Sequence, residues 1–402
     1  MRVLVADTLH PKGLDRMKEG GCDVHCDPSL KDESLLAALD GADWDALVVR
    51  STRVSGAMIG ACNLGLIVRA GAGVNTIDVA AASAAGIYVA NCPGKNGLAV
   101  AELAIGLLVS LDRRIPDAVS QLRAGQWNKK EFSQARGLAG RTLAIVGAGQ
   151  IGRAVAQRAR GLDMEVWGWD ISPFAKQALE DMGAHFTDDL MGMLSRADAV
   201  SIHLPATPQT TGLANREFFE AMKDGAYFIN TSRKELVDEE ALLWALETKD
   251  MRAGIDVFEG EVSGGTGQVT SRLLDSAQVW ATPHIGASTD QAQEAVADEA
   301  ARLVLQFNAT GSVQSVNLSN GVTSGPQLVV RHRNQVGVLS TVFSELSQEG
   351  INIGNTENIV FSGGEACIAR ISISDGVSAQ VLDRIRAAHE GILHVQLSSP
   401  GT

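Results

Sequence analysis

The chain has 402 residues, of which 45% are hydrophobic and 20% charged, and its formal net charge is −13. A length of roughly 150 residues per domain predicts two or three domains. The acidic balance disfavours proteins that bind nucleic acid or anionic membranes, because their binding faces need clustered positive charge. The 42 glycines against 10 prolines indicate many tight turns between strands and helices, which argues against a fibrous or disordered chain.

The first ninety residues alternate short strands with helices. Runs rich in Val, Ile, Leu and Ala predict strands over 3–6, 46–49, 66–69 and 87–90, and helical spacing predicts helices over 11–19, 30–39 and 79–85. This alternation is typical of a doubly wound parallel sheet that helices cover on both faces. A long helix over 98–113 and a second over 116–124 are expected next, with Pro116 at a helix start.

Two further units are predicted after residue 140. The first is a second α/β series, with strands over 142–146, 165–169, 199–204, 226–231, 253–257 and 279–281 and a helical pattern from Ser288 to about Phe307. The stretch 311–327 has the composition of a linker. The last unit has the order strand 328–332, helix 337–349, strand 352–360, strand 365–374, helix 377–388 and strand 392–397, a ferredoxin-like βαββαβ pattern.

The five scattered cysteines favour a cytoplasmic protein, since free thiols without a disulfide framework are typical of a reducing compartment. Cys22 and Cys26 have a metal-like spacing, but no second ligand pair follows, so we expect a strand edge there and no metal site. The N-terminal apolar run is too short for a secretory signal. The longest apolar stretch, 99–111, is well under a membrane span, so no membrane association is expected.

A glycine-rich turn predicts a dinucleotide site. Strand 142–146 runs into Gly147-Ala148-Gly149-Gln150-Ile151-Gly152 and then into a helix, and the next strand ends at Asp170. Gly147 permits the tight turn, Gly149 leaves space for a pyrophosphate and Gly152 lets the helix pack on the strand. The helix N-terminus attracts the phosphates. Asp170 suits ribose hydroxyls and would repel a 2′-phosphate, which favours NAD over NADP.

Three polar residues follow strands of the same predicted sheet, where open α/β sheets bind ligands. Arg233, Glu261 and His284 come after the strands that end near 231, 257 and 281. Taken singly, each also fits a structural role: Arg233 and Glu261 as solvated loop charges, and His284 as a turn or core histidine.

The surrounding segments resemble the D-isomer-specific 2-hydroxyacid dehydrogenases. The similar motifs are Asn-Thr-Ser-Arg at 230–233, Gly-Ile-Asp-Val-Phe-Glu-Gly-Glu at 254–261 and Thr-Pro-His-Ile-Gly-Ala-Ser-Thr at 282–289. Further matches in order lie at 49–51, 69–75, 91–94, 100–102 and 123–127. The resemblance covers nearly the whole chain, and it is strongest to the members that act on 3-phosphoglycerate.

The resemblance implies NAD-dependent oxidation of 3-phospho-D-glycerate to 3-phosphohydroxypyruvate, the first step of phosphorylated L-serine biosynthesis. Arg233 would pair with the substrate carboxylate. His284 would be the general base for the C2 hydroxyl, and Glu261 would hold its other ring nitrogen. Arg50 and Arg69 would bind the substrate phosphate, although ordinary strand-end charges remain an alternative for both.

Other positions matched to the family complete the predicted sites. Asp256 would receive the nicotinamide carboxamide. The cofactor cleft would be lined by His203, Pro205, Thr211, Ser232 and His284, together with the glycine loop and Asp170. The substrate side would include Ser51, Gly73 and Asn75 beside Arg50, Arg69 and Arg233.

The chain departs from the family pattern next to two of these residues. Lys234 and Glu235 follow Arg233, where small residues are usual, and Val262 follows Glu261 in place of a proline. The loop 263–271 is rich in Gly and Thr. We expect these changes to bear on the choice of substrate more than on the type of reaction.

The last unit resembles an ACT domain, a small-ligand regulatory module. In serine-inhibited relatives, the residues that match His332, Asn334 and Asn352 contact the amino acid across a dimer of these modules. The resemblance therefore implies L-serine as an effector, while a module that only dimerises the protein is the alternative. Val336 stands where a proline is usual.

The expected organisation has three domains. A discontinuous substrate-binding domain takes 1–91 and 290–309, a Rossmann domain takes 92–289, and the ACT domain takes 327–402. Hinges near Asn91 and Ser288 would let the first two close. Trp127 is predicted at a dimer contact, in a homodimer or homotetramer, with a solvated loop as the alternative. The alternatives are another D-2-hydroxyacid dehydrogenase, acting on hydroxypyruvate, glyoxylate or a different phosphorylated acid, and a non-catalytic protein that senses NAD.

Overall fold

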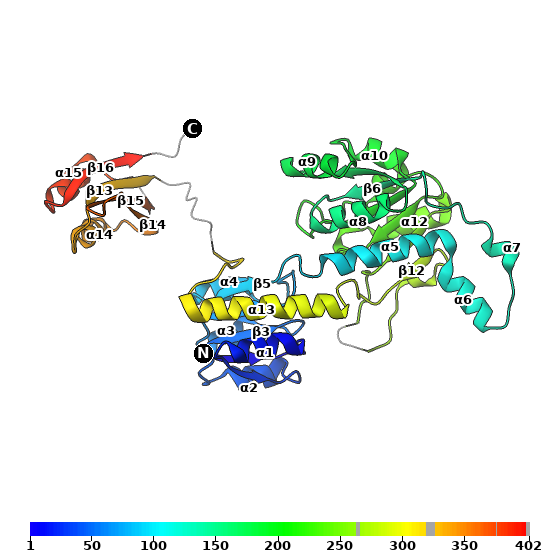
Figure 1. The fold of residues 1–402 in the computed structure, drawn as a ribbon, viewed down its shortest axis with the longest axis horizontal. Coiled ribbons are helices and arrows are strands. Elements are labelled where there is room, and N and C mark those ends of the chain that lie inside the picture. Colours follow the sequence, from blue (N-terminus) through cyan, green and yellow to red (C-terminus); the bar gives the residue numbers. More distant parts are fainter. Residues whose placement is uncertain (263–265, 319–325, 375, 399–402) are drawn as a thin grey trace. The chain divides into compact units, whose positions relative to one another are not determined.

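The computed structural model describes residues 1–262, 266–318, 326–374 and 376–398 (Figure 1). Two compact units are present, Met1–Asn317 and Leu318–Thr402. Residues 319–325 of the predicted linker and residues 263–265 of the predicted irregular loop lie outside the described residues. Within the described part of the chain, no helix has both the length and the apolar character needed to cross a bilayer.

The first unit contains a five-stranded parallel sheet in its N-terminal part. Its strands are β1 (Arg2–Val5), β2 (Asp23–Cys26), β3 (Ala46–Val49), β4 (Leu66–Arg69) and β5 (Tyr88–Asn91). The order β2-β1-β3-β4-β5 is the flavodoxin-like order of a doubly wound fold, as the sequence predicted. The segment between Cys22 and Cys26 forms the edge strand β2.

Helices cover both faces of this sheet. They are α1 (Pro11–Glu19), α2 (Asp32–Leu39), α3 (Gly56–Gly60), α4 (Val79–Ala84) and the long α13 (Asp290–Thr310), which returns from the far end of the unit. Figure 1 shows α13, in yellow, beside α1. Gly13 permits this close packing, because a Cβ there would lie 2.6 Å from the carbonyl oxygen of Ala297.

The second sheet has seven parallel strands in the order β12-β11-β10-β9-β6-β7-β8. They are β6 (Thr142–Val146), β7 (Glu165–Trp169), β8 (His185–Phe186), β9 (Ala199–Ile202), β10 (Tyr227–Asn230), β11 (Arg252–Ile255) and β12 (Val279–Ala281). The predicted Rossmann order is therefore present. The sequence predicted six strands and missed β8, because two residues cannot display a strand alternation.

Helices pack on both faces of the second sheet as well. They are α5 (Gly97–Arg113), α8 (Gln150–Arg160), α9 (Pro173–Asp181), α10 (Leu190–Arg196), α11 (Arg216–Ala221) and α12 (Glu239–Lys249), with 3₁₀ turns η1 (Lys234–Leu236) and η2 (Arg272–Asp275) in the connecting loops. In contrast, α6 (Ile115–Arg123) and α7 (Lys129–Phe132) contain no buried residue and form an arm that follows α5 (Figure 1). Helices α5 and α8 pack against each other in Figure 1.

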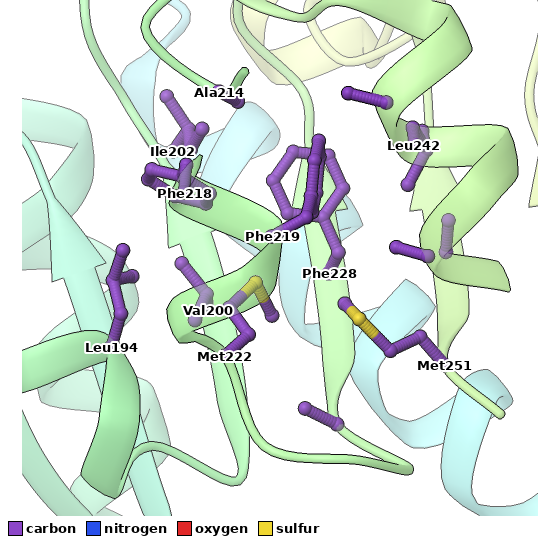
Figure 2. Close-up of a cluster of buried hydrophobic side chains, with 14 of the residues drawn as sticks. Leu194, Val200, Ile202, Ala214, Phe218, Phe219, Met222, Phe228, Leu242 and Met251 are labelled. Atoms are coloured by element: carbon purple, nitrogen blue, oxygen red, sulfur yellow. The ribbon is translucent and has the colours of Figure 1, made fainter. Parts of the chain in front are cut away.

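The core on the opposite face is built around three phenylalanines (Figure 2). Phe218 and Phe219 on α11 and Phe228 on β10 are fully buried. Their rings meet edge to face, with the centroids of Phe219 and Phe228 5.1 Å apart. Such pairs add to the stabilisation from burial alone. This core fixes β9 and β10, and hence the position of the loops that follow them.

The second unit is a four-stranded antiparallel sheet with the order β14-β15-β13-β16. The chain runs through β13 (Gln327–Arg333), α14 (Val338–Gln348), β14 (Ile353–Val360), β15 (Ala366–Ile373), α15 (Ala379–Ala387) and β16 (Ile392–Ser398). Val342 and Leu346 of α14 and Ile385 of α15 pack on the sheet. The predicted ferredoxin-like βαββαβ topology is confirmed.

Replacing Phe219 by alanine tests the weight of the aromatic core. We expect Phe219→Ala to lower the free energy of unfolding by about 3–5 kcal/mol, because a buried ring leaves a cavity that its neighbours fill only in part. Urea unfolding followed by circular dichroism measures the loss. Phe174→Ala is the matched control, since that ring is 80% exposed, and its effect should stay within about 0.5 kcal/mol. Equal losses in both variants would contradict the assignment.

Candidate active site

A cavity of about 810 Å³ is lined by residues from both parallel sheets of the first unit. Arg50 and Ser51 follow β3, and Arg69 ends β4. Glu261 follows β11, and His284 follows β12. All five stand at or beyond the carboxyl ends of their strands, where the loops of parallel sheets gather. The structure therefore brings these predicted substrate and catalytic residues around one space.

Positive charge is concentrated at this cavity. Arg69 is largely buried, and burial lowers its pKa, with the charges of Arg233 and Arg50 lowering it further. Its Nε atom is buried, and no hydrogen-bond partner for it exists among the described residues. The guanidinium folds over Gly71, whose Cβ would collide with Nη1. Mutually repelling guanidinium groups with unused donors are suited to an anion that carries more than one charge.

Arg233 lies next to this cluster. Its backbone carbonyl accepts a hydrogen bond from Asn230 Nδ2 at 2.9 Å, and its Nη1 donates to the Ser232 carbonyl at 2.7 Å. A Cβ at Gly73 would stand 3.2 Å from both Arg233 Nη2 and Asn75 Oδ1. The predicted substrate residues Gly73 and Asn75 thus adjoin Arg233. Ser232 is held separately, since its Oγ donates to the Ile202 carbonyl at 2.6 Å.

His284 and Glu261 form a hydrogen-bonded pair. His284 Nδ1 lies 2.7 Å from Glu261 Oε2, and Glu261 Oε1 accepts the backbone N–H of Phe258 at 3.1 Å. The carboxylate is therefore fixed on one side and orients the imidazole on the other. Since Nδ1 is engaged by Glu261, Nε2 is the ring nitrogen left to exchange a proton with a ligand.

A buried carboxylate holds the loop that carries His284. Asp256 is 1% exposed. It accepts hydrogen bonds from Thr282 Oγ1 at 2.5 Å, the Ile285 N–H at 2.9 Å and the Gly286 N–H at 2.7 Å. His284 has φ = 54°, a left-handed conformation that is uncommon outside glycine. Such backbone persists where the surroundings fix it, and the three bonds to Asp256 do so.

The glycine loop fits a dinucleotide. Gly147 has φ = 99°, and a Cβ there would approach the His203 carbonyl oxygen to 2.7 Å. A Cβ at Gly152 would lie 2.0 Å from the Gly147 carbonyl oxygen. Gly149, in contrast, faces open space. Helix α8 begins with Gln150 and Ile151, so the free backbone N–H groups of its first turn are available to a pyrophosphate in that space.

The other predicted cofactor residues lie at neighbouring strand ends. Asp170 follows β7, and its carboxylate accepts the N–H groups of Ala148 and Ser172, both at 2.7 Å. Burial lowers the pKa of His203 to about 3, so its ring stays neutral at physiological pH. Pro205 and Thr211 are exposed beyond β9. Thr211 Oγ1 donates to the Thr207 carbonyl at 2.8 Å.

Lys234, which departs from the family pattern, forms an ion pair. Lys234 Nζ lies 2.8 Å from Glu259 Oε2, and this bond raises the pKa of Lys234, with the charges of Glu235 and Glu261 also contributing. The pair joins the loop after β10 to the loop after β11. Val262 lines the cavity beside Glu261.

In the second unit, the predicted regulatory residues do not meet within one chain. His332 is buried, with Nδ1 2.7 Å from the Arg333 carbonyl and Nε2 3.1 Å from Asn358 Oδ1. Asn334 Nδ2 donates to the Gly364 carbonyl at 2.9 Å. Both residues stand near the start of β15, whereas Asn352 lies beside Ser374 at its other end. About six residues of strand separate them, roughly 20 Å.

Sequence reasoning missed several residues of the cavity. Asp7, His10, Asn96, Phe258 and Gln293 also line it. Asp7 carries a signal that was available, since it directly follows a predicted strand, as Arg50 does. Gln293 carries none: the segment 290–309 was expected in the substrate domain, but nothing in the sequence indicates which residues of its helix, α13, face the cavity.

Comparisons with known proteins identify the family. Residues 105–286 match the model for the NAD-binding domain of D-isomer specific 2-hydroxyacid dehydrogenases. A D-3-phosphoglycerate dehydrogenase of Methanocaldococcus jannaschii is 40% identical over 299 residues, which are 73% of this chain and 55% of the relative. One from Mycobacterium bovis is 38% identical over 353 residues, 85% of this chain and 64% of the relative. The chain thus spans between about half and two thirds of these relatives' length.

Solved structures agree with this result. The TT0316 protein of Thermus thermophilus is 34% identical with a TM-score of 0.68, and the match covers 77% of this chain and 97% of that protein. The pyruvate reductase of Chlamydomonas reinhardtii is 26% identical with a TM-score of 0.67, covering 76% and 95%. Together with the glycine loop and its terminal acid, these matches show that the chain belongs to the D-isomer-specific 2-hydroxyacid dehydrogenases, a family of NAD-dependent oxidoreductases.

Proposed function

We propose that the chain oxidises 3-phospho-D-glycerate to 3-phosphohydroxypyruvate with NAD, in the cytoplasm, as the first step of phosphorylated L-serine biosynthesis. The observation that carries the proposal is the cavity shared by Arg50, Arg69, Glu261 and His284. The cavity combines a proton acceptor, His284, with two arginines, Arg50 and Arg69, whose positive charge can bind an anion at a second position. Relatives named D-3-phosphoglycerate dehydrogenase support this substrate over a simple hydroxyacid.

The residues divide the reaction between them. Oxidation removes a hydride from C2 and a proton from the C2 hydroxyl, and NAD supplies the hydride acceptor when bound. Arg233 pairs with the substrate carboxylate, which fixes C2 relative to His284. His284 Nε2 takes the hydroxyl proton, and Glu261 stabilises the imidazolium that results. Arg50 and Arg69 hold the phosphate at the far end of the substrate, with Ser51 beside them.

The cofactor residues follow the same logic. Gly147–Gly152 and the N-terminus of α8 would hold the pyrophosphate, and the Asp170 carboxylate would accept hydrogen bonds from the ribose hydroxyls. Asp256 has oxygen lone pairs beyond the three bonds it accepts, so it serves the nicotinamide carboxamide while it holds the His284 loop. Residues 92–289 form the cofactor domain, 1–91 with 290–309 form the substrate domain, and closure occurs at hinges near Asn91 and Ser288.

Self-association and regulation complete the proposal. Leu122 of α6 is 55% exposed, and Trp127, between α6 and α7, is 81% exposed. These exposed apolar side chains support a homo-oligomer in which a second copy covers α6 and α7. Residues 327–402, within the second unit, act as an ACT domain. Because Asn352 is far from His332 and Asn334 in one chain, a shared L-serine site requires two copies of this unit.

The proton-transfer pair is tested by His284→Ala and Glu261→Gln. We expect His284→Ala to lower kcat with 3-phosphoglycerate by about 10²–10⁴-fold, because it removes the general base. Glu261→Gln keeps the geometry and should lower kcat less, by about 10–100-fold. NADH absorbance measures both rates. His185→Ala, an exposed histidine stacked on Trp167 at β8, serves as the control and should leave kcat unchanged.

The phosphate site is tested by Arg69→Ala. We expect kcat/KM for 3-phosphoglycerate to fall about 10–100-fold, since a charge-assisted hydrogen bond to the phosphate is lost. Arg196→Ala, an exposed arginine over the Trp167 ring, is the matched control. An unchanged kcat/KM in Arg69→Ala would contradict the role of Arg69.

Activity of the wild type on hydroxypyruvate or glyoxylate but not on 3-phosphoglycerate would favour another D-2-hydroxyacid dehydrogenase, and NAD binding without turnover would favour a sensor.

Regulation is tested by titrating L-serine into the same assay. We expect inhibition at millimolar L-serine, none with D-serine, and loss of inhibition in Asn352→Ala with the uninhibited rate kept. Asn352 is the suitable position because it is exposed and its side chain is not part of the sheet core. A wild-type rate that L-serine does not change would indicate a module that only dimerises the protein.

A further inference from the structure

Among the described residues, Asp7 is, with Glu261, one of two carboxylates that line the cavity, and it lies beside the arginines Arg50 and Arg69. It follows β1 and lines the same cavity as Arg50 and Arg69. Its carboxylate is not directed at a ligand, because both oxygens have partners in the chain. Oδ2 accepts three backbone N–H groups, from Arg50 at 2.6 Å, Ser51 at 3.1 Å and Thr52 at 2.9 Å. Oδ1 accepts Ser51 Oγ at 3.3 Å.

Three consecutive N–H groups that point to one oxygen form an anion-binding concavity of the backbone. Here the anion is the carboxylate of Asp7, a residue of the same chain. β1 and β3 are neighbouring parallel strands with Val5 opposite Val48, so Asp7 arrives directly opposite the turn that follows β3. Thr52 Oγ1 adds a bond to the Ala6 carbonyl at 3.1 Å. The path of residues 50–52 is therefore fixed by Asp7 and its neighbour.

The other end of Arg50 is held as well. Arg50 Nη1 donates to Gln293 Oε1 at 3.3 Å, so Arg50 is fixed at its backbone by Asp7 and at its guanidinium by α13. The carboxylate of Asp7 also acts on Arg69, whose pKa it raises against the lowering by burial and by the other two guanidinium groups. It thus offsets part of the repulsion among three clustered cations.

We propose that Asp7 is a positioning residue that sets the affinity for the phosphate end of the substrate by fixing Arg50 and Ser51 at the cavity wall. This inference rests on the proposed function. Asp7 itself touches neither substrate nor cofactor. Its role differs from that of a structural carboxylate, because its loss moves the phosphate ligands and leaves the proton-transfer pair His284–Glu261 in place.

The test compares Asp7→Ala and Asp7→Asn with Asp45→Asn. Asp45 is the matched control: its Oδ2 accepts one backbone N–H, from Arg2 at 2.6 Å, at the opposite end of the same sheet. We expect Asp7→Ala to raise KM for 3-phosphoglycerate about 10–100-fold, with kcat within about threefold and KM for NAD unchanged. Asp7→Asn keeps an accepting oxygen and should raise KM less. Asp45→Asn should leave all three constants unchanged.

Two further measurements separate positioning from a general loss of structure. Amide hydrogen exchange at residues 50–52 should accelerate in Asp7→Ala, since those N–H groups lose their acceptor. The inhibition constant of D-glycerate, which has no phosphate, should stay within about threefold of the wild-type value. A wild-type KM for 3-phosphoglycerate in Asp7→Ala overturns the inference. An inhibition constant of D-glycerate that rises as much as the KM for 3-phosphoglycerate overturns it too.

The failure of this inference is distinguishable from the failure of the proposed function. A wild-type enzyme without turnover of 3-phosphoglycerate overturns the proposed function, and the inference with it. A wild-type enzyme that turns over 3-phosphoglycerate, beside an Asp7→Ala variant with unchanged KM, overturns the inference alone.

Discussion

The candidate site depends on one constraint, the common direction of the strands in each parallel sheet. Parallel strands place all their carboxyl ends at one edge, so the loops that follow them must meet there. In the first sheet this edge carries Asp7, Arg50 and Arg69. In the second it carries the loops of Arg233, Glu261 and His284. Residues more than two hundred positions apart share a cavity for this reason, and no direct contact between them is needed to bring them together.

The same constraint makes the site electrostatically demanding. Arg50, Arg69 and Arg233 repel one another, although the chain as a whole carries a net charge of −13. A protein holds such a cluster only if the surrounding structure fixes each member. Arg69 folds over Gly71, Arg233 is tied to its own loop, and Arg50 is held by Asp7 and Gln293. The same positive charges that repel one another would attract the phosphorylated acid that we propose as substrate.

Much of this arrangement could be predicted from the sequence. The glycine loop and Asp170 could be recognised from a short segment, because each glycine is needed for the path of the backbone and Asp170 is needed for its charge. Arg233, Glu261 and His284 could be found because each stands after a strand with a clear apolar pattern. Asp7 satisfies the same rule, but a carboxylate does not fit the search for cations around an anion. Its partners are backbone N–H groups, which have no signature in the sequence.

Other features were beyond sequence reasoning for geometric reasons. β8 has two residues, and α3 and α7 have five and four, too few for a periodic pattern. The sequence placed 290–309 in the substrate domain, but which residue of α13 reaches the cavity, here Gln293, depends on how that helix is rotated against the first sheet. The ion pair between Lys234 and Glu259 follows from the separation of two neighbouring loops, whereas the sequence showed only that Lys234 departs from the family pattern.

The second unit arranges its loops differently from the first. Its neighbouring strands are antiparallel, so its loops are divided between the two ends of the sheet, and residues at opposite ends do not meet. His332 and Asn334 stand at one end of β15 and Asn352 at the other. A parallel sheet can assemble a binding site from one chain, as the cavity in the first unit does. One copy of the antiparallel sheet holds these three residues apart, whereas two copies can bring them together. Any effector that uses all three must therefore bind where two chains meet, and so its binding is linked to the association of the chains.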